Sequence, residues 1–298
     1  MQRRKSCCRC CLATGTSAFD AEHAPTFLER DGHRTWIKWH RARRRFGDTA
    51  FTARRIAEGM RAGASVEIDL MLTADARLAV LHDRQLRRAT TGTGRVGAHT
   101  ADHLRSLRLR DAAGRPTDAH VLIFDDVPSL LAGTGIHPEA LLQLDFKQTA
   151  EDLNETALES FARAVAPIRR HTILSCGDAV AVALLTERVP DVRIGHDPCH
   201  RGAIRRVLRS GEFDRFVADA VNAAPRAEMI YLHHALVLEA DRRGHDLVGA
   251  FHEAGRRIDA YTIARADADA RPAITRLLDL RVDQITTDDP EGLAISTS

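Results

Sequence analysis

The sequence predicts a single (β/α)8 barrel, or TIM barrel, for most of its 298 residues. Short apolar runs alternate with amphipathic stretches along the chain, which is typical of parallel strands joined by right-handed helical crossovers. There are eight such runs, and the chain length is also typical of this barrel. Charged residues follow several of the runs, at the ends of strands where barrel enzymes carry their active sites.

The expected strands end near His40, Leu70, Phe146, Ser175, His196, Leu232, Ile263 and Thr287. Helical patterns are expected at 49–61, 153–164, 179–188, 201–223, 236–254 and 270–280. A doubly wound open sheet is the second fold that such alternation allows. No G-x-G-x-x-G segment follows the first strand, which disfavours that alternative.

Residues 1–30 are expected to form a disordered extension, because they are polar and show no periodicity. Four cysteines at positions 7, 8, 10 and 11 lack the paired spacing and distant partner of a zinc site. Cys176 and Cys199 stand alone, which fits a reducing cytoplasm. The barrel is expected to span residues 31–298, with a small insertion at about 84–138 after the second strand.

That insertion is predicted from an irregular interval. After the second expected strand comes another apolar run, at 78–81, which is followed by a turn-rich segment at 90–94 and two weak helical patterns. Because the insertion follows the C-terminal end of a strand, it is expected on the catalytic side of the barrel, where it brings His82 near the site.

Two carboxylates share one face of the second strand. In residues 65–70 (S-V-E-I-D-L) the apolar and acidic positions alternate, so Glu67 and Asp69 point one way and the apolar residues the other. Two acids separated by two strand steps, about 7 Å, repel each other. A divalent cation between them removes that repulsion.

The third expected strand repeats this alternation of apolar and charged residues. In residues 141–147 (L-L-Q-L-D-F-K), Asp145 and Lys147 share the face opposite to the apolar residues. Three carboxylates on two strands make an all-oxygen site suited to Mg²⁺ or Ca²⁺. The alternative is that these acids lie on half-exposed strands, but two strands with complementary charges favour a site. Lys147 is one of only three lysines among 43 basic residues.

A set of short motifs occurs in a fixed order along the chain. The segments are H-R-A (40–42), E-I-D (67–69), T-A-D-A-R-L-A-V-L-H-D (73–83), L-R-R-A-T-T-G-T-G (86–94), D-F-K (145–147), G-R-R-I-D-A-Y-T (255–262) and R-V-D-Q-I-T-T-D-D-P (281–290). They resemble the motifs of the glycerophosphodiester phosphodiesterase family. The resemblance runs from about residue 36 to 292 and marks a divergent member.

The departures from the family pattern fall near the expected site. Ala42 replaces the glycine of H-R-G, and Gly47 stands where a glutamate usually follows. Asp145 is one methylene shorter than the family's glutamate, and Tyr261 replaces a tryptophan. These changes suggest an altered substrate pocket or a repositioned ion.

The resemblance implies the role of each site residue. His40 and His82 are expected to act as general base and general acid, in an order that the sequence leaves open. Glu67, Asp69 and Asp145 are expected to hold the ion. Arg41 and Lys147 are expected to contact the phosphate, and Tyr261 the alcohol side; the two cations are alternatively paired with the carboxylates.

The implied reaction is metal-dependent hydrolysis of a glycerophosphodiester to sn-glycerol 3-phosphate and an alcohol. One alternative is a sphingomyelinase D-like lyase that releases a cyclic phosphate. Another is a silent barrel that binds phosphodiesters or a partner protein. The net charge of +2 indicates no nucleic-acid partner, and no run reaches the ~20 apolar residues of a membrane span. A small-molecule substrate and a cytoplasmic location are expected, while the oligomeric state is not predicted.

Overall fold

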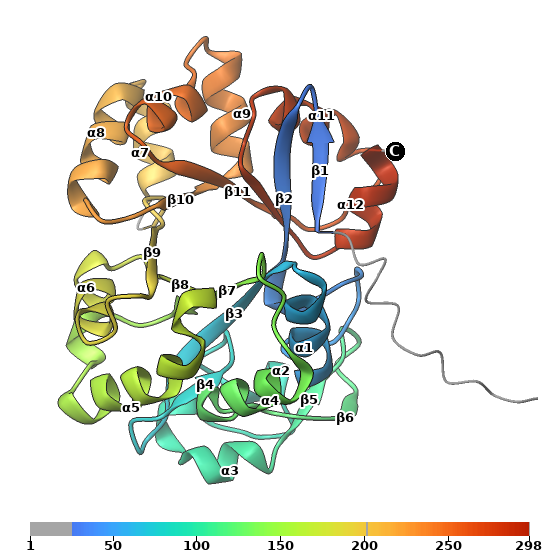
Figure 1. The fold of residues 1–298 in the computed structure, drawn as a ribbon, viewed down its shortest axis with the longest axis vertical. Coiled ribbons are helices and arrows are strands. Elements are labelled where there is room, and N and C mark those ends of the chain that lie inside the picture. Colours follow the sequence, from blue (N-terminus) through green and yellow to red (C-terminus); the bar gives the residue numbers. More distant parts are fainter. Residues whose placement is uncertain (1–25, 201, 298) are drawn as a thin grey trace, which may run out of the picture.

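The computed structural model describes residues 26–200 and 202–297, and its centre is a closed barrel of eight parallel strands (Figure 1). The strands are β2 (His33–Trp39), β3 (Ser65–Leu72), β7 (Leu141–Phe146), β8 (Thr172–Ser175), β9 (Arg193–His196), β10 (Met229–His233), β11 (Arg257–Ile263) and β12 (Gln284–Thr287). Parallel pairing of β2 with both β12 and β3 closes the ring. The predicted fold class and all eight predicted strands are confirmed.

Helices between the strands form the outer layer. They are α1 (Ala53–Ala62), α4 (Val127–Thr134), α5 (Glu155–Val165), α6 (Ala179–Glu187), α7 (Ala203–Ser210), α8 (Phe213–Ala223), α9 (His234–Arg242), α10 (Leu247–Glu253), α11 (Arg271–Asp279) and α12 (Pro290–Thr297), with 3-10 helices η5 (Ala150–Asp152) and η6 (Ala166–His171). The patterns at 201–223 and 236–254 were each expected to form one helix, but each forms two: α7 and α8 in the first, α9 and α10 in the second. Gly211 and Gly244 take left-handed φ angles of 74° and 81°, which end the first helix of each pair.

One strand lies in a segment that was expected to be disordered. β1 (Phe27–Arg30) pairs antiparallel with β2 through a turn at Asp31 and Gly32, which both have positive φ angles. Asp-Gly is a strong signal for a two-residue hairpin turn, and it was available in the sequence. Folded structure therefore begins before residue 31. The four N-terminal cysteines lie outside the described residues.

An excursion follows β3 and has a hydrophobic core of its own. It contains β4 (Leu78–Val80), α2 (Leu86–Ala89), η3 (Val96–Ala98), α3 (Ala101–Arg105), the hairpin β5 (Arg108–Arg110) and β6 (Pro116–His120), and η4 (Phe124–Asp126). Its core includes Leu81, Leu86 and Leu104. The excursion lies at the bottom of Figure 1. The expected insertion included α4, but α4 packs beside α1 as a barrel helix.

Polar side chains fill much of the barrel interior. On β3, Val66, Ile68 and Leu70 belong to the main core, as do the corresponding residues of the other strands. The alternate positions of the strands carry buried polar residues instead, including Lys38 and Gln143. The interior is tightly filled: a Cβ added at Gly195 would collide with the ring of Tyr231.

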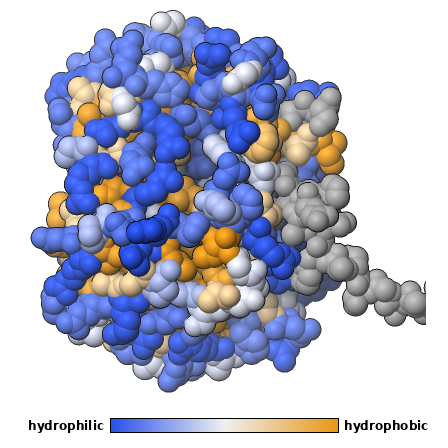
Figure 2. Space-filling view, in the orientation of Figure 1, coloured by the Kyte–Doolittle hydropathy of each residue, from blue (hydrophilic) through white to orange (hydrophobic). Residues whose placement is uncertain are grey.

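On the face shown in Figure 2 the hydrophobic residues form scattered patches between hydrophilic ones. Within the described residues, no helix is both long enough and apolar enough to cross a bilayer.

Candidate active site

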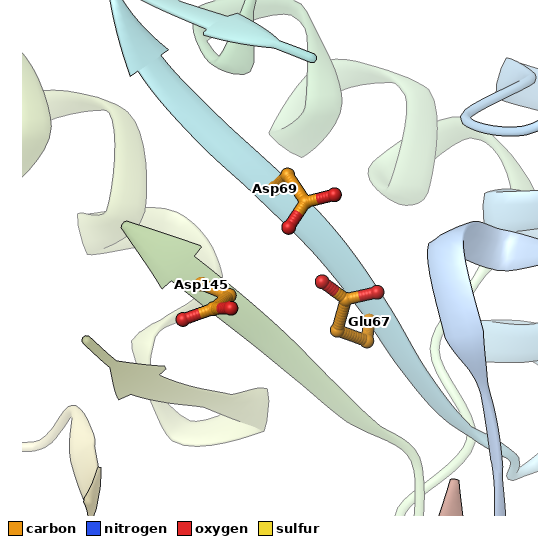
Figure 3. A group of neighbouring side chains, drawn as sticks. All are labelled: Glu67, Asp69 and Asp145. Atoms are coloured by element: carbon orange, nitrogen blue, oxygen red, sulfur yellow. The ribbon is translucent and has the colours of Figure 1, made fainter. Parts of the chain in front are cut away.

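Three carboxylates from neighbouring strands meet at one end of the barrel (Figure 3). Glu67 and Asp69 lie on β3, and Asp145 lies on β7, where it pairs in register with Asp69. One carboxylate oxygen from each residue lies within 4.8 Å of those of the other two. The structure therefore brings together the three acids that the sequence predicts as metal ligands.

Asp69 is the most buried of the three. Its side chain is fully inaccessible, and neither carboxylate oxygen accepts a hydrogen bond from the described residues. Its neighbours are cationic: Lys147 Nζ lies 2.8 Å from Oδ1 and Arg41 Nε 3.4 Å from Oδ2, without hydrogen-bond geometry. Burial, and then the charge of Glu67, raise the pKa of Asp69 to about 7. A buried carboxylate without hydrogen bonds, in an all-oxygen group, fits a hard divalent cation.

Asp145 is held by two donors. Ser175 Oγ donates to its Oδ1 at 3.0 Å, and Lys147 donates to its Oδ2. Burial alone would raise the pKa of Asp145, but Lys147 and Ser175 outweigh burial and lower it. Burial opposes the charge of Lys147 too, yet Asp145, Asp69 and Glu67 together raise the pKa of that ammonium group. Asp145 is therefore ionised at neutral pH.

His40 follows β2 in the 3-10 helix η2 (His40–Ala42) and faces the carboxylates. Its Nδ1 lies 2.8 Å from Asp288 Oδ1, and its Nε2 lies 4.0 Å from Glu67 Oε2. Because an ionised carboxylate only accepts hydrogen bonds, Asp288 assigns the proton to Nδ1 and leaves Nε2 as an acceptor. Burial lowers the pKa of His40, despite the opposing effect of Asp288.

His82 has the same type of partner, although it belongs to the excursion. Its Nδ1 lies 2.8 Å from Asp83 Oδ1, which leaves Nε2 available to substrate. Burial is also the main cause that lowers the pKa of His82. His40 and His82 are therefore each paired with an aspartate through Nδ1, and the sequence does not single out Asp288 as a partner.

The turn after His40 binds a carboxylate through its backbone. Arg41 and Ala42 have φ angles of 54° and 55°, and the backbone N–H of Arg41 donates to Glu67 Oε2 at 2.7 Å. Ala42 thus adopts the left-handed conformation that glycine favours, so the missing glycine does not prevent this turn. The Arg41 side chain faces Asp69, so the alternative of an internal ion pair holds in this structure.

The wall formed by β9 and β11 carries a third histidine. Tyr261 donates from its hydroxyl to Asp197 Oδ2 at 2.9 Å, and His200 Nε2 lies 3.0 Å from the same oxygen. The bond to Asp197 raises the pKa of His200. His200 and Asp197 were not expected at the site from the sequence; the signal available for them was the H-D-P-C-H segment after the fifth barrel strand.

These groups surround one cavity of about 270 Å³. Its lining residues include His40, Arg41, Glu67, His82, Asp145, Lys147, Asp197, His200 and Tyr261. Asp69 lies beneath this surface, because it is fully buried. The cavity is small, and its lining residues offer cations, proton donors and proton acceptors. Such a set of groups suits the cleavage of a small anionic substrate.

Comparisons with known proteins agree with this chemistry. Residues 51–292 match the model of the family described as the glycerophosphoryl diester phosphodiesterase family. The YqiK protein of Bacillus subtilis is 28% identical over 142 residues, which cover 45% of this chain; the chain spans only 55% of that relative.

Solved structures show a similar fold at low identity. A glycerophosphodiester phosphodiesterase from Agrobacterium tumefaciens is 22% identical with a TM-score of 0.63, and the match covers 88% of this chain and 99% of that one. A phosphodiesterase from Oleispira antarctica, in complex with the product sn-glycerol-3-phosphate, is 16% identical with a TM-score of 0.61, covering 87% and 95%.

Proposed function

This chain belongs to the glycerophosphoryl diester phosphodiesterase family, and we propose that it hydrolyses glycerophosphodiesters to sn-glycerol 3-phosphate and an alcohol, with a divalent cation bound to the three carboxylates. The proposal rests on one observation above all. Two imidazoles, each with an aspartate on Nδ1, line the same cavity as the carboxylate group.

Glu67, Asp69 and Asp145 are the residues that would hold the ion, which supplies positive charge to the phosphoryl oxygens when bound. The donor set contains only oxygen, as Mg²⁺ and Ca²⁺ prefer. Three carboxylates face two cations, Arg41 and Lys147, so a divalent cation compensates the remaining negative charge.

The histidines supply the proton transfers. Hydrolysis of a phosphodiester needs one group to take a proton from the attacking water and another to protonate the leaving oxygen. His40 and His82 each present Nε2 while an aspartate binds Nδ1, which keeps the ring orientation and tautomer constant. The aspartates also stabilise the imidazolium form that appears after proton uptake.

Substrate contacts come from the rest of the wall. Lys147 is one-quarter exposed beside Asp145 and offers its ammonium group to a phosphoryl oxygen. Tyr261 and His200, joined through Asp197, lie on the β9 and β11 side and are the polar groups available to hydroxyls of the substrate. The cavity volume, about 270 Å³, suits a small polar moiety.

A panel of glycerophosphodiesters incubated with Mg²⁺ or Ca²⁺ tests the function, with release of sn-glycerol 3-phosphate as the measurement. We expect His40→Ala and His82→Ala to lower kcat by about 10²–10⁴-fold, the usual contribution of a general acid or base. His120→Ala, an exposed histidine of the β5–β6 hairpin, is the control and should retain activity. The proposal fails if the wild-type protein turns over no member of the panel with either metal, the outcome expected of a silent barrel.

The lyase alternative is separated by the products. Asp145 and Lys147 form a D-x-K strand, which is the feature that favours a sphingomyelinase D-like reaction. Phosphorus NMR during turnover should show the monoester without a persistent cyclic phosphate. A cyclic species that accumulates to the end of the reaction would assign the chain to lyase chemistry.

A further inference from the structure

A chain of buried polar side chains crosses the barrel interior below the carboxylates. It begins at Lys38 on β2, whose ammonium group lies 2.9 Å from Asp259 Oδ2 and 4.2 Å from the centre of the Tyr231 ring. Lys38 and Asp259 are 2% and 0% exposed, so this ion pair is almost completely shielded from solvent. The catalytic steps above do not use it.

The series of hydrogen-bonded side chains continues from Lys38 to a proposed metal ligand, Asp145. Lys38 donates to Gln143 Oε1, Gln143 Nε2 donates to Ser175 Oγ at 2.8 Å, and Ser175 Oγ donates to Asp145 Oδ1 at 3.0 Å. Gln143 and Ser175 are 5% and 1% exposed. Lys38 is therefore connected to Asp145 entirely through buried side chains.

Only one direction of donation satisfies this chain. An ammonium group has no acceptor, so Lys38 requires the amide oxygen of Gln143 to face it and turns the amide N–H groups toward Ser175. Ser175 Oγ then accepts from Gln143, and its single proton is left for Asp145. The charge of Lys38 thus ensures that Asp145 Oδ1 accepts a hydrogen bond from Ser175, although Lys38 and Asp145 are not in contact.

We infer that Lys38 and Gln143 are positioning residues that act through Ser175 to orient Asp145 as a metal ligand. The inference rests on the proposed metal site. Ser175 binds Oδ1 and Lys147 binds Oδ2, so the carboxylate plane of Asp145 is held from two sides. Outer partners of this kind orient metal ligands, and losing one typically weakens metal affinity by about 10–100-fold.

The choice of lysine supports a specific role. The chain has 43 basic residues and only three lysines, and the two that the structure describes, Lys38 and Lys147, both face the barrel interior. Each reaches Asp145, one directly and one through Gln143 and Ser175. A compact ammonium group fits between such partners, whereas the guanidinium fork needs more space and more acceptors.

The experiment is a calorimetric titration of the metal-free protein with Mn²⁺, which needs no substrate. Ser175→Ala should weaken Mn²⁺ binding by about 10–100-fold. Ser65→Ala is the matched control, because Ser65 is also buried in the barrel, on β3 on the other side of β7, and its hydroxyl has no hydrogen-bond partner among the described residues. Its affinity should equal that of the wild type.

Two further variants test the relay itself. In Gln143→Glu the new carboxylate accepts from both Lys38 and Ser175, so Ser175 no longer donates to Asp145 and Mn²⁺ binding should weaken although the added negative charge alone would strengthen it. Lys38→Met, combined with Asp259→Asn so that no buried charge is left unpaired, frees the Gln143 amide to turn and should weaken binding as well. Thermal melts identify any variant that does not fold.

Each result is decisive. Weaker Mn²⁺ binding by folded Ser175→Ala and Gln143→Glu, with Ser65→Ala unchanged, supports the relay. Unchanged or tighter binding by Gln143→Glu overturns it, even if stability falls. A wild-type protein that binds no Mn²⁺ removes the metal site and the relay together, whereas binding without turnover of glycerophosphodiesters contradicts only the proposed substrate.

Discussion

At the scale of single residues, the burial of Asp69 lowers the stability of the fold and also suits this carboxylate to the proposed metal site. It is fully buried beside Glu67, and burial together with that charge raises its pKa from 3.8 to about 7. Buried carboxylates without hydrogen bonds are costly to keep ionised. A cation bound at the proposed site would relieve the repulsion between Asp69 and Glu67, so stability should depend on both pH and metal.

The pH dependence has a definite sign. Since the pKa of Asp69 is higher in the folded than in the unfolded chain, its contribution to stability is present below pH 3.8 and is lost as the pH rises through about 7. In the presence of EDTA, Asp69→Asn should therefore raise the free energy of unfolding at pH 8 by about 1–3 kcal/mol. At pH 5 the gain should be smaller, because pH 5 lies between the two pKa values and only part of the contribution has been lost there.

Urea denaturation at the two pH values measures this difference. Asp118→Asn, which removes a fully exposed carboxylate from β6, is the control and should behave the same at pH 5 and pH 8. An equal effect of Asp69→Asn at both pH values would contradict the assignment of the raised pKa.

At the scale of elements, the excursion after β3 is what carries His82 to the site. Leu81, the preceding residue, is buried in the excursion core and donates from its backbone N–H to the Asp69 carbonyl at 3.1 Å. His82 is thus attached to β3 on one side and to a separate hydrophobic core on the other. Loosening that core should affect proton transfer more than metal binding.

Leu104→Ala tests this division. Leu104 lies on α3 and is fully buried in the excursion core, so its loss should cost about 2–5 kcal/mol of local stability. We expect kcat to fall several-fold while Mn²⁺ affinity stays within twofold of wild type, measured well below the melting temperature.

The matched control is Leu277→Ala on α11, which removes an equally buried leucine from the main core. It should lower the melting temperature with little effect on kcat. If both variants lose the same fraction of activity, the excursion has no separate role in placing His82.

At the scale of the whole molecule, the proposed ion site joins two adjacent barrel strands. Glu67 and Asp69 come from β3 and Asp145 from β7, so a cation bound to all three stabilises the closed barrel relative to the unfolded chain. Ligand binding to the folded state alone contributes about 2.7 kcal/mol at 100 times the Kd. For a chain of this size that corresponds to several degrees in Tm.

Thermal melts with added MgCl2 or CaCl2, and again after EDTA, measure this stabilisation. The increase in Tm should disappear in Glu67→Gln, which loses one ligand. It should persist in Glu253→Gln, which changes an exposed carboxylate at the end of α10. A rise in Tm that survives in Glu67→Gln would place the ion elsewhere.

Local patterns were enough to predict much of this protein. Strand alternation has a period of two residues, so the sequence alone placed Glu67 and Asp69 on one face and predicted the eight barrel strands. The β5–β6 hairpin was missed because its strands are short and mostly exposed. β1 was missed because it is short and mostly exposed, and the polar residues before the Asp-Gly turn are typical of a disordered segment.

Contacts between distant segments needed the closed barrel. Asp288 binds His40 from 248 positions away, and Gln143 meets Lys38 from 105 positions away, because strands that are far apart in the chain become neighbours or face each other across the interior. The sequence by itself determined which residue types carry the chemistry and which strand face they occupy, since backbone geometry sets both locally. Only the tertiary structure decided their partners, because hydrogen bonds between side chains form only where the closed barrel brings them within reach.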